Sequence, residues 1–234
     1  MKDTIQDKDK LVNSVFSEVY KKYDFMNDLM SFGIHRVWKE KFLDWMSPLP
    51  HTSLIDVASG TGDIAKLFLQ RCDISNHITC VEPNLKMLEE GKSKLIWYKS
   101  VNWINSKAEK IPVKDNTYDY YSISFGLRNV SNINLALKEA LRVLKPGGRM
   151  ICLEFSKIDN EVLDFLYKQY SKAIPYIGKI IVGSEKPYQY LIESIQEFYN
   201  QEDLAELMKK NGFSNVEYRN LSNGIAAIHS GWKI

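Results

Sequence analysis

Between Ser53 and Glu154 the chain alternates short apolar runs with segments of helical periodicity, and this alternation limits the fold more than any other feature. The apolar runs are bounded by turn residues, and the segments between them repeat their apolar residues every three or four positions. Strands that alternate with helices form a parallel, doubly wound sheet, because each helix carries the chain back to start the next strand in the same direction. We therefore predict an α/β fold, with strands at 53–57, 78–82, 101–105, 118–125 and 149–154 and helices at 63–71, 84–95 and 133–144.

The segments that flank this alternation have a different character. Leu11 to Tyr20 and Val37 to Trp45 have helical spacing, and we expect residues 9–47 to form a helical lid. The stretch 159–199 is rich in apolar and aromatic residues and is expected to form a helical substrate cap. We predict two or three helical pieces there, separated by Pro175, Gly178, Gly183 and Pro187.

The end of the sequence predicts a helix followed by a hairpin. The helix covers 202–210, and two strands at 215–220 and 225–230 are separated by a Ser-Asn-Gly turn. We interpret residues 1–234 as a single domain, since the length suits one α/β unit.

Charge and cysteine content exclude several classes of protein. The formal net charge is +2 and no basic run of five occurs, so we expect no nucleic-acid partner. Three cysteines, of which Cys80 and Cys152 lie in apolar runs, indicate buried thiols in a reducing compartment rather than a disulfide framework. Metal ligation by these thiols is the weaker alternative, and we assign no metal site. No apolar stretch reaches the length of a membrane span, so we expect a cytoplasmic protein whose membrane contact, if it has any, is peripheral at the inner face.

The loop after the first predicted strand is the first candidate binding site. It runs from Asp56 to Asp63, and its small residues Ala58, Gly60 and Gly62 let the backbone approach a ligand closely. Glu82, at the end of the second strand, can accept hydrogen bonds from both ribose hydroxyls of a nucleoside. The loop also fits the relaxed dinucleotide pattern, which leaves a nucleotide-dependent dehydrogenase open.

Charge favours a different cofactor for this loop. The negative side chains of Asp56 and Asp63 oppose a pyrophosphate but suit the sulfonium and ammonium groups of S-adenosylmethionine. An equal alternative for Asp63 is that it only caps its helix.

Four further segments carry a family resemblance. Two are long, YDFMNDLMSFGIHRVW at 23–38 and RVLKPGGRMICLEFS at 142–156, and two are short, SFGLRN at 124–129 and AAIHSGW at 226–232. Together they resemble the signatures of the ubiquinone/menaquinone biosynthesis C-methyltransferases, from about residue 11 onward.

This resemblance implies a class I S-adenosylmethionine-dependent methyltransferase fold, Rossmann-like, with a seven-stranded, mostly parallel sheet and a C-terminal antiparallel strand. It implies methyl transfer from S-adenosylmethionine to a ring carbon of a polyprenylated quinol in menaquinone or ubiquinone biosynthesis. It also carries over positions that contact the cofactor, which are Thr61, Glu82, Lys107, Ala108 and Ser124.

The chain departs from the family pattern in three places. Ala58-Ser59 stands where a more glycine-rich loop is usual, and Glu82 stands where aspartate is common. Lys107 stands where related enzymes often have Asn or Asp facing the adenine. Because an ammonium cannot accept a hydrogen bond from the adenine amino group, we assign that role to the backbone of Lys107 or Ala108.

The catalytic candidates follow the fourth predicted strand or precede the sheet. Arg128 could stabilise a phenolate, and its alternative is to pair with a carboxylate and order a loop. Asn129 could position the same ring. His35 could take a proton, although a structural hydrogen bond is the commoner role of a lone histidine. Tyr23 and Asp24 are further candidates, in a motif that could fold over the cofactor as a lid. Tyr23 could wall the ring pocket, although packing is the commoner role for such a residue.

Three other functions stay open from sequence alone. They are another small-molecule methyltransferase on this fold, the dehydrogenase named above and a non-catalytic quinone-binding subunit of a biosynthetic complex. Ordinary core or homodimer packing is the alternative for the apolar stretch 159–199.

Overall fold

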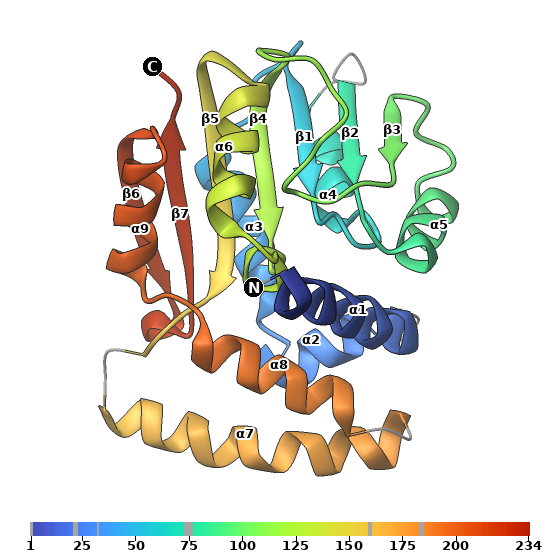
Figure 1. Ribbon diagram of the computed structural model, residues 1–234, viewed down its shortest axis with the longest axis vertical. Coiled ribbons are helices and arrows are strands. Elements are labelled where there is room, and N and C mark those ends of the chain that lie inside the picture. Colours follow the sequence, from blue (N-terminus) through green and yellow to red (C-terminus); the bar gives the residue numbers. More distant parts are fainter. Residues whose placement is uncertain (1, 21–22, 32, 73–76, 159–160, 183–184) are drawn as a thin grey trace.

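The computed structural model describes residues 2–20, 23–31, 33–72, 77–158, 161–182 and 185–234, and Figure 1 shows them as a sheet with helices on both faces. Seven strands in these residues form one sheet in the order β3-β2-β1-β4-β5-β7-β6. Their bounds are β1 Ser53–Val57, β2 His77–Val81, β3 Val101–Ile104, β4 Tyr118–Ser124, β5 Leu144–Phe155, β6 Ser214–Leu221 and β7 Ala226–Trp232.

Strands β1 to β5 are parallel, whereas β7 is antiparallel to both of its neighbours, β5 and β6. The predicted fold class is confirmed, and so is the closing hairpin. The strand β5 begins earlier than predicted, at Leu144, because its first residues join the sheet. Leu144 pairs with Tyr118, and the backbone N–H of Gly147 donates to the carbonyl of Lys233 at 2.7 Å.

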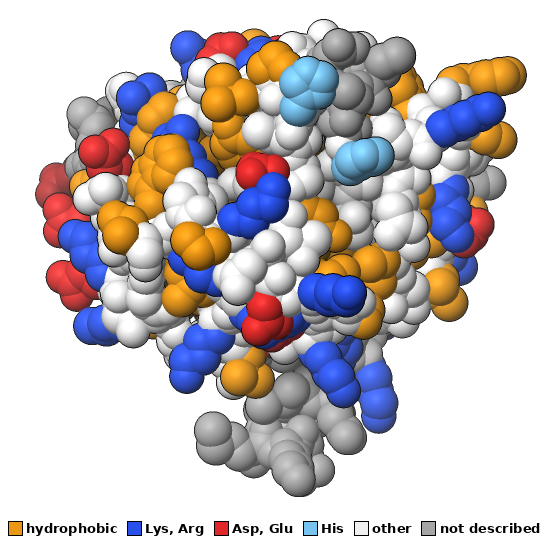
Figure 2. Space-filling model, turned by 90° about the horizontal axis from the view of Figure 1, so that it is seen from above, with side chains coloured by type: hydrophobic (Ala, Val, Ile, Leu, Met, Phe, Trp, Pro, Cys, Tyr) orange, Lys and Arg blue, Asp and Glu red, His pale blue; other side chains and the backbone are white. Residues whose placement is uncertain are grey.

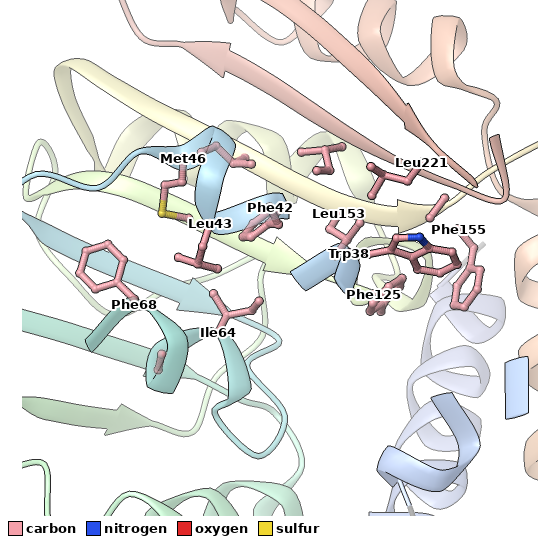
Figure 3. Close-up of a cluster of buried hydrophobic side chains, with 14 of the residues drawn as sticks. Trp38, Phe42, Leu43, Met46, Ile64, Phe68, Phe125, Leu153, Phe155 and Leu221 are labelled. Carbon is pink, nitrogen blue, oxygen red and sulfur yellow. The ribbon is translucent and has the colours of Figure 1, made fainter. Parts of the chain in front are cut away.

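Two layers of helices bury the two faces of the sheet. On one face lie α3 (His35–Met46) and α4 (Asp63–Arg71). Figure 3 shows apolar side chains of α3 beside those of β5 at one end and beside those of α4 at the other. On the other face lie α6 (Ile133–Val143) and α9 (Gln201–Lys210). Side chains alternate along β1, so Leu54 joins the first core and Ile55 the second.

The remaining long helices lie across the lower end of the sheet in Figure 1, where the parallel strands end. These are α1 (Lys2–Val19), α2 (Tyr23–Ser31), α7 (Glu161–Val182) and α8 (Lys186–Glu197), while α5 (Leu85–Lys94) follows β2. Figure 2 shows the opposite end of the molecule, where acidic and basic side chains lie among apolar ones. In the part of the chain that the structure describes, no helix is long and apolar enough to cross a membrane.

The predicted break at Pro175 and Gly178 is wrong, because α7 runs through both residues. A proline removes only its own N–H from the helix ladder, and tertiary packing can compensate for that loss. Here Ser171 and Ile174, which precede the proline, are both buried against the rest of the protein. Gly183 lies outside the described residues. Pro187 occupies the first turn of α8, where a missing N–H leaves no hydrogen bond unmade.

Candidate active site

A cavity of about 310 Å³ lies where the carboxyl ends of β1, β2, β3 and β4 meet. The order of the strands reverses between β1 and β4, and open α/β sheets bind ligands at such a point. The segments after the four strands line the floor of this cavity. We call it the donor cavity, because it contains residues that the sequence predicts to bind the methyl donor. The floor residues include Ala58, Gly60, Glu82, Lys107, Ala108, Phe125, Gly126 and Asn129.

Glu82 is the acidic group of the donor cavity. It is 5% exposed, and each of its carboxylate oxygens accepts one backbone N–H, from Gly60 and from Asn84, both at 2.9 Å. Burial raises the pKa of Glu82 to about 7, although these two hydrogen bonds oppose the rise. Since a carboxylate oxygen has two lone pairs, both oxygens can accept a further hydrogen bond from a ligand hydroxyl.

The helix α1 forms the roof of the donor cavity and is tied to three strand ends by polar contacts. The amide of Asn84 donates to Asn13 Oδ1 at 2.6 Å and to Ser17 Oγ at 2.8 Å. The ammonium of Lys8 donates to the carbonyl of Val130 at 2.9 Å. A third tie, made by Asp9, reaches the end of β3.

An ion pair with Asp9 gives the side chain of Lys107 a structural role. The carboxylate of Asp9 pairs with the ammonium of Lys107 and accepts a hydrogen bond from the hydroxyl of Ser131. Lys107 therefore fastens the roof helix to the sheet. This contact supplies a role for its side chain that does not involve the adenine.

Gly126 brings the loops after β1 and β4 close together beneath the cavity. A Cβ at this position would lie 2.5 Å from Cβ of Ala58, which is closer than any real contact. Ala58 itself has a φ of 50° and Phe125 a φ of 55°, both in the left-handed region. The loops after β1 and β4 can approach each other this closely only because residue 126 has no side chain.

A second, smaller space adjoins the donor cavity and is called the side compartment below. It shares Ala58, Gly60 and Phe125 with the donor cavity and has a volume of about 20 Å³. Its lining is strongly polar and includes Lys39, Asp56, Ser59, Thr61, Asp63 and Ser124. A space of this size has room for about one water molecule.

Asp56 is the most deeply buried charge of the side compartment, at 1% exposure. Its Oδ1 accepts a hydrogen bond from Ser122 Oγ at 2.6 Å, while its Oδ2 has no partner among the described residues. Burial raises the pKa of Asp56 to about 7, and the nearby carboxylates of Asp63 and Glu82 add to this rise.

Arg128 follows β4 in the short helix η2 (Leu127–Asn129) and is fully buried in its side chain. Its Nη1 donates to Glu154 Oε1 at 2.6 Å and to the carbonyl of Phe125 at 2.7 Å. The guanidinium carbon lies 5.5 Å from the ring centre of Phe155. The carboxylate pairing weighed from sequence is therefore present. Within the described residues, however, Nε and Nη2 have no hydrogen-bond partner.

Arg128 lines neither the donor cavity nor the side compartment, and the other catalytic candidates differ in their placement. Asn129 lines the donor cavity and accepts a hydrogen bond from the hydroxyl of Tyr190 at 3.0 Å. His35 lies 2.9 Å from Asp28 through its Nε2, and it lines neither the donor cavity nor the side compartment. Burial lowers the pKa of His35, although the hydrogen bond to Asp28 opposes this shift. Tyr23 and Asp24 begin α2, and their side chains lie outside the described residues.

Eight of the nine predicted cofactor positions line one of the two spaces. Gly62 is the exception. With a φ of 84° it begins α4, and a Cβ there would lie 2.8 Å from Leu95 and 3.2 Å from Trp103. The requirement for glycine at this position therefore comes from helix packing.

Sequence reasoning missed Lys39, which enters the side compartment from α3. The signal was present, because Lys39 falls in the buried stripe of its helix with His35, Trp38, Phe42 and Leu43. A lysine at such a position is rarely buried without a partner. Its ammonium donates to Asp63 Oδ2 at 2.6 Å.

The fold and the site define the chain as a methyltransferase of the class I, S-adenosylmethionine-dependent architecture. Solved structures share this fold. A SAM-dependent methyltransferase from Aquifex aeolicus superposes with a TM-score of 0.66 at 18% identity, over 92% of this chain and 97% of that one. A phosphoethanolamine N-methyltransferase 2 from Haemonchus contortus, solved with S-adenosyl-L-methionine, gives 0.64 at 15% identity, over 84% and 52%.

Sequence comparison narrows this class to a family. The ubiE/COQ5 methyltransferase family matches residues 3–233, and the chain belongs to it. The ubiquinone/menaquinone biosynthesis C-methyltransferase UbiE of Brucella abortus (strain S19) is 47% identical, covering 97% of this chain and 87% of that protein. The protein of the same name from Ruegeria sp. (strain TM1040) is 49% identical, covering 95% and 90%.

Proposed function

We propose that this protein transfers a methyl group from S-adenosylmethionine to a ring carbon of a polyprenylated quinol in ubiquinone or menaquinone biosynthesis. The observation that carries the proposal is Glu82, a buried carboxylate at the end of β2 whose two oxygens are held by backbone N–H groups beside the donor cavity. Two acceptors fixed in this way match the two neighbouring hydroxyls of a ribose. Family membership supplies the reaction class.

The residues present fit a cationic nucleoside donor. Glu82 would hold the ribose, and the backbone of Lys107 or Ala108 would meet the adenine. Asp56 and Asp63, which line the side compartment, would stabilise the positive charges of the donor. When bound, S-adenosylmethionine supplies a methyl group on a positively charged sulfur, already activated for attack by a nucleophilic carbon.

Arg128 is the residue that we assign to the acceptor ring. Its unpartnered Nε and Nη2 can donate to a quinol oxygen as that oxygen loses its proton, while Glu154 fixes the guanidinium through Nη1. Donors that are aimed before the reaction stabilise the developing anion without reorganisation. Asn129, which lines the donor cavity, would position the ring next to the donor.

The helices at the carboxyl edge would enclose the acceptor, with residues 9–47 as a lid and 159–199 as a substrate cap. Two contacts support this assignment. Tyr190 of α8 donates to Asn129, and α1 roofs the donor cavity. A further space of about 430 Å³ lies between α7 and α8, with Phe165, Pro175 and Ile192 in its lining, and would take part of the polyprenyl tail.

Turnover of defined quinols tests the reaction. Purified protein is incubated with S-adenosylmethionine and either demethylmenaquinol or a methoxy-polyprenyl-benzoquinol in detergent. The quinones are then extracted and their masses are measured by mass spectrometry. We expect a mass gain of one methyl group. Arg128→Gln should lose about 10²- to 10³-fold in turnover but keep its affinity for S-adenosylhomocysteine. Arg71→Gln, which removes a surface ion pair with Glu40, serves as the control.

Either of two results would contradict the assignment. If neither quinol is methylated, the proposed class of acceptor is refuted. Full turnover by Arg128→Gln would show that Arg128 is not a catalytic residue. Titration of NAD against S-adenosylmethionine separates a methyltransferase from a dehydrogenase in the same samples.

We also propose that α7 contacts the membrane surface peripherally, from the cytoplasmic side. Phe165 and Leu166 are 60% and 56% exposed on this helix, next to the space between α7 and α8. The side chains of Ile180 and Ile181 lie outside the described residues. Cosedimentation with anionic lipid vesicles should fall for Phe165→Glu/Leu166→Glu and not for Leu135→Glu on α6. Unchanged sedimentation together with loss of a dimer would assign this face to a second copy of the chain.

A further inference from the structure

The side compartment contains more polar groups than the fold requires. Asp56 Oδ2 and the hydroxyls of Ser59 and Ser124 are buried without a hydrogen-bond partner in the described part of the chain. Each such group costs free energy unless something satisfies it. All three residues line the side compartment, which shares Ala58, Gly60 and Phe125 with the donor cavity. This arrangement indicates that a ligand completes the compartment.

Lys39 supplies the positive charge of this compartment. It is 6% exposed, and its ammonium has three N–H donors, of which the hydrogen bond to Asp63 uses one. The compartment therefore holds one ammonium beside two carboxylates, those of Asp56 and Asp63. A ligand group that fits this set carries a negative and a positive charge a few ångströms apart.

The helix α3 fixes the position of the Lys39 backbone beside the side compartment. Its neighbours Trp38, Phe42 and Leu43 are at most 2% exposed, and Figure 3 shows all three packed among the side chains of the core. The backbone of residue 39 is therefore fixed before any ligand arrives. On binding, only the side chain of Lys39 has to reorient, so less conformational entropy is lost than for a lysine on a mobile surface segment.

We propose that Lys39 binds the carboxylate of the amino-acid end of the methyl donor, while Asp63 and Asp56 bind its ammonium. The inference rests on the proposed function, since it concerns the same donor. The zwitterion inserts into the ion pair between Lys39 and Asp63, so each charge of the pair exchanges one partner for another. Because the compartment holds about one water, the flexible Lys39 side chain turns from Asp63 as the amino-acid end enters.

This arrangement makes the N-terminal helical segment part of the donor site rather than a cover for the acceptor alone. It also selects the donor by a group far from the reacting methyl. A nucleoside thioether that lacks the carboxylate would leave Lys39 paired with Asp63 and gain nothing from it. The preference for the carboxylate is therefore the measurable signature of Lys39.

The test compares two ligands in two proteins by isothermal titration calorimetry. The ligands are S-adenosylhomocysteine and its decarboxylated analogue, which share the nucleoside, the neutral sulfur and the ammonium. We expect the native protein to bind S-adenosylhomocysteine at least tenfold more tightly. In Lys39→Met the affinity for S-adenosylhomocysteine should fall tenfold or more, and that for the analogue should change by less than threefold. Lys39→Arg keeps the charge and should keep most of the preference.

Lys41→Met is the matched control, since Lys41 is an exposed lysine two residues further along the same helix. An equal loss for both ligands in Lys39→Met would overturn the inference, because it would mean a structural role. Equal binding of the two ligands by the native protein would also overturn the inference, and this measurement does not depend on the folding of any variant. If the native protein binds neither S-adenosylhomocysteine nor S-adenosylmethionine, the proposed function itself fails.

Discussion

Replacement of Asp56 by asparagine should change how stability depends on pH. The carboxyl group is buried, accepts a hydrogen bond from Ser122 and has a pKa of about 7, whereas an exposed aspartate has a pKa near 3.8. Between these two values the folded chain holds a proton that the unfolded chain has released. The free energy of unfolding therefore falls as the pH rises from about 4 to about 7, and this loss is complete above pH 7.

The size of the effect follows from the shift in pKa. One pKa unit corresponds to about 1.4 kcal/mol, so a shift of about three units corresponds to a loss of about 4 kcal/mol over the whole range. Between pH 5 and pH 8 the share of Asp56 is about 3 kcal/mol. Asparagine keeps the shape and can accept the hydrogen bond from Ser122, but it does not titrate. The variant should thus lose about 3 kcal/mol less than the native protein over this interval.

Urea denaturation followed by circular dichroism, without ligand, measures the free energy of unfolding of the native protein and of the variant at pH 5 and pH 8. The variant Asp203→Asn is the control, because this aspartate is exposed on α9. Equal pH dependence in Asp56→Asn and native protein would refute the reasoning. It would mean that the carboxylate is well solvated in the folded state and that the site holds no unfavourable negative charge for a cationic donor to relieve.

Three other substitutions test separate parts of the site and fold. Glu82→Gln should weaken S-adenosylhomocysteine binding at least tenfold by calorimetry and lower thermal stability, because its amide would face a backbone N–H and leave a buried donor unpaired, at about 1 to 3 kcal/mol. Gly126→Ala should reduce donor affinity, since its Cβ would push Ala58 away, and unchanged binding would contradict the close approach. Burial lowers the pKa of His229 to about 4, so the free energy of unfolding should fall as the pH drops from about 6.5 to 4. The glutamine of His229→Gln can still donate to the carbonyl of Gln201 but does not titrate. Over this pH range the variant should therefore lose about 3 kcal/mol less free energy of unfolding than the native protein, as measured by acid denaturation.

The centre of the sheet was predictable from sequence because β1, β2 and β4 are buried on both faces. Such strands are continuous apolar runs, and the turn residues between them limit their ends to within one or two positions. The start of β5 was missed because Lys145, Pro146 and two glycines are typical of a turn. Here they lie between Leu144 and Arg149, which both pair with β4, and the two glycines exchange backbone hydrogen bonds with Lys233. The continuity of α7 past Pro175 was missed for a related reason. Long-range packing, which a local pattern does not contain, decided the outcome.

The site was predictable where a loop places its own residues and not where distant segments meet. The residues after β1, and Glu82 after β2, follow from the rule that ligands bind at the carboxyl ends of parallel strands. The ion pair between Asp9 and Lys107 joins residues 98 positions apart. The hydrogen bond from Lys39 to Asp63 joins α3 to the start of α4. No spacing rule links these pairs. A charged residue within an apolar helical stripe was the one hint that sequence offered.

The position of β7 has a consequence for synthesis of the protein. In space β7 separates β5 from β6, but the ribosome makes it after α7, α8, α9 and β6. Until residues 226–232 have emerged, the nascent chain presents the edge of β5 with its backbone groups unpaired, and such bare edges recruit other strands. We therefore expect the half-made chain to be the form of this protein that most needs a chaperone.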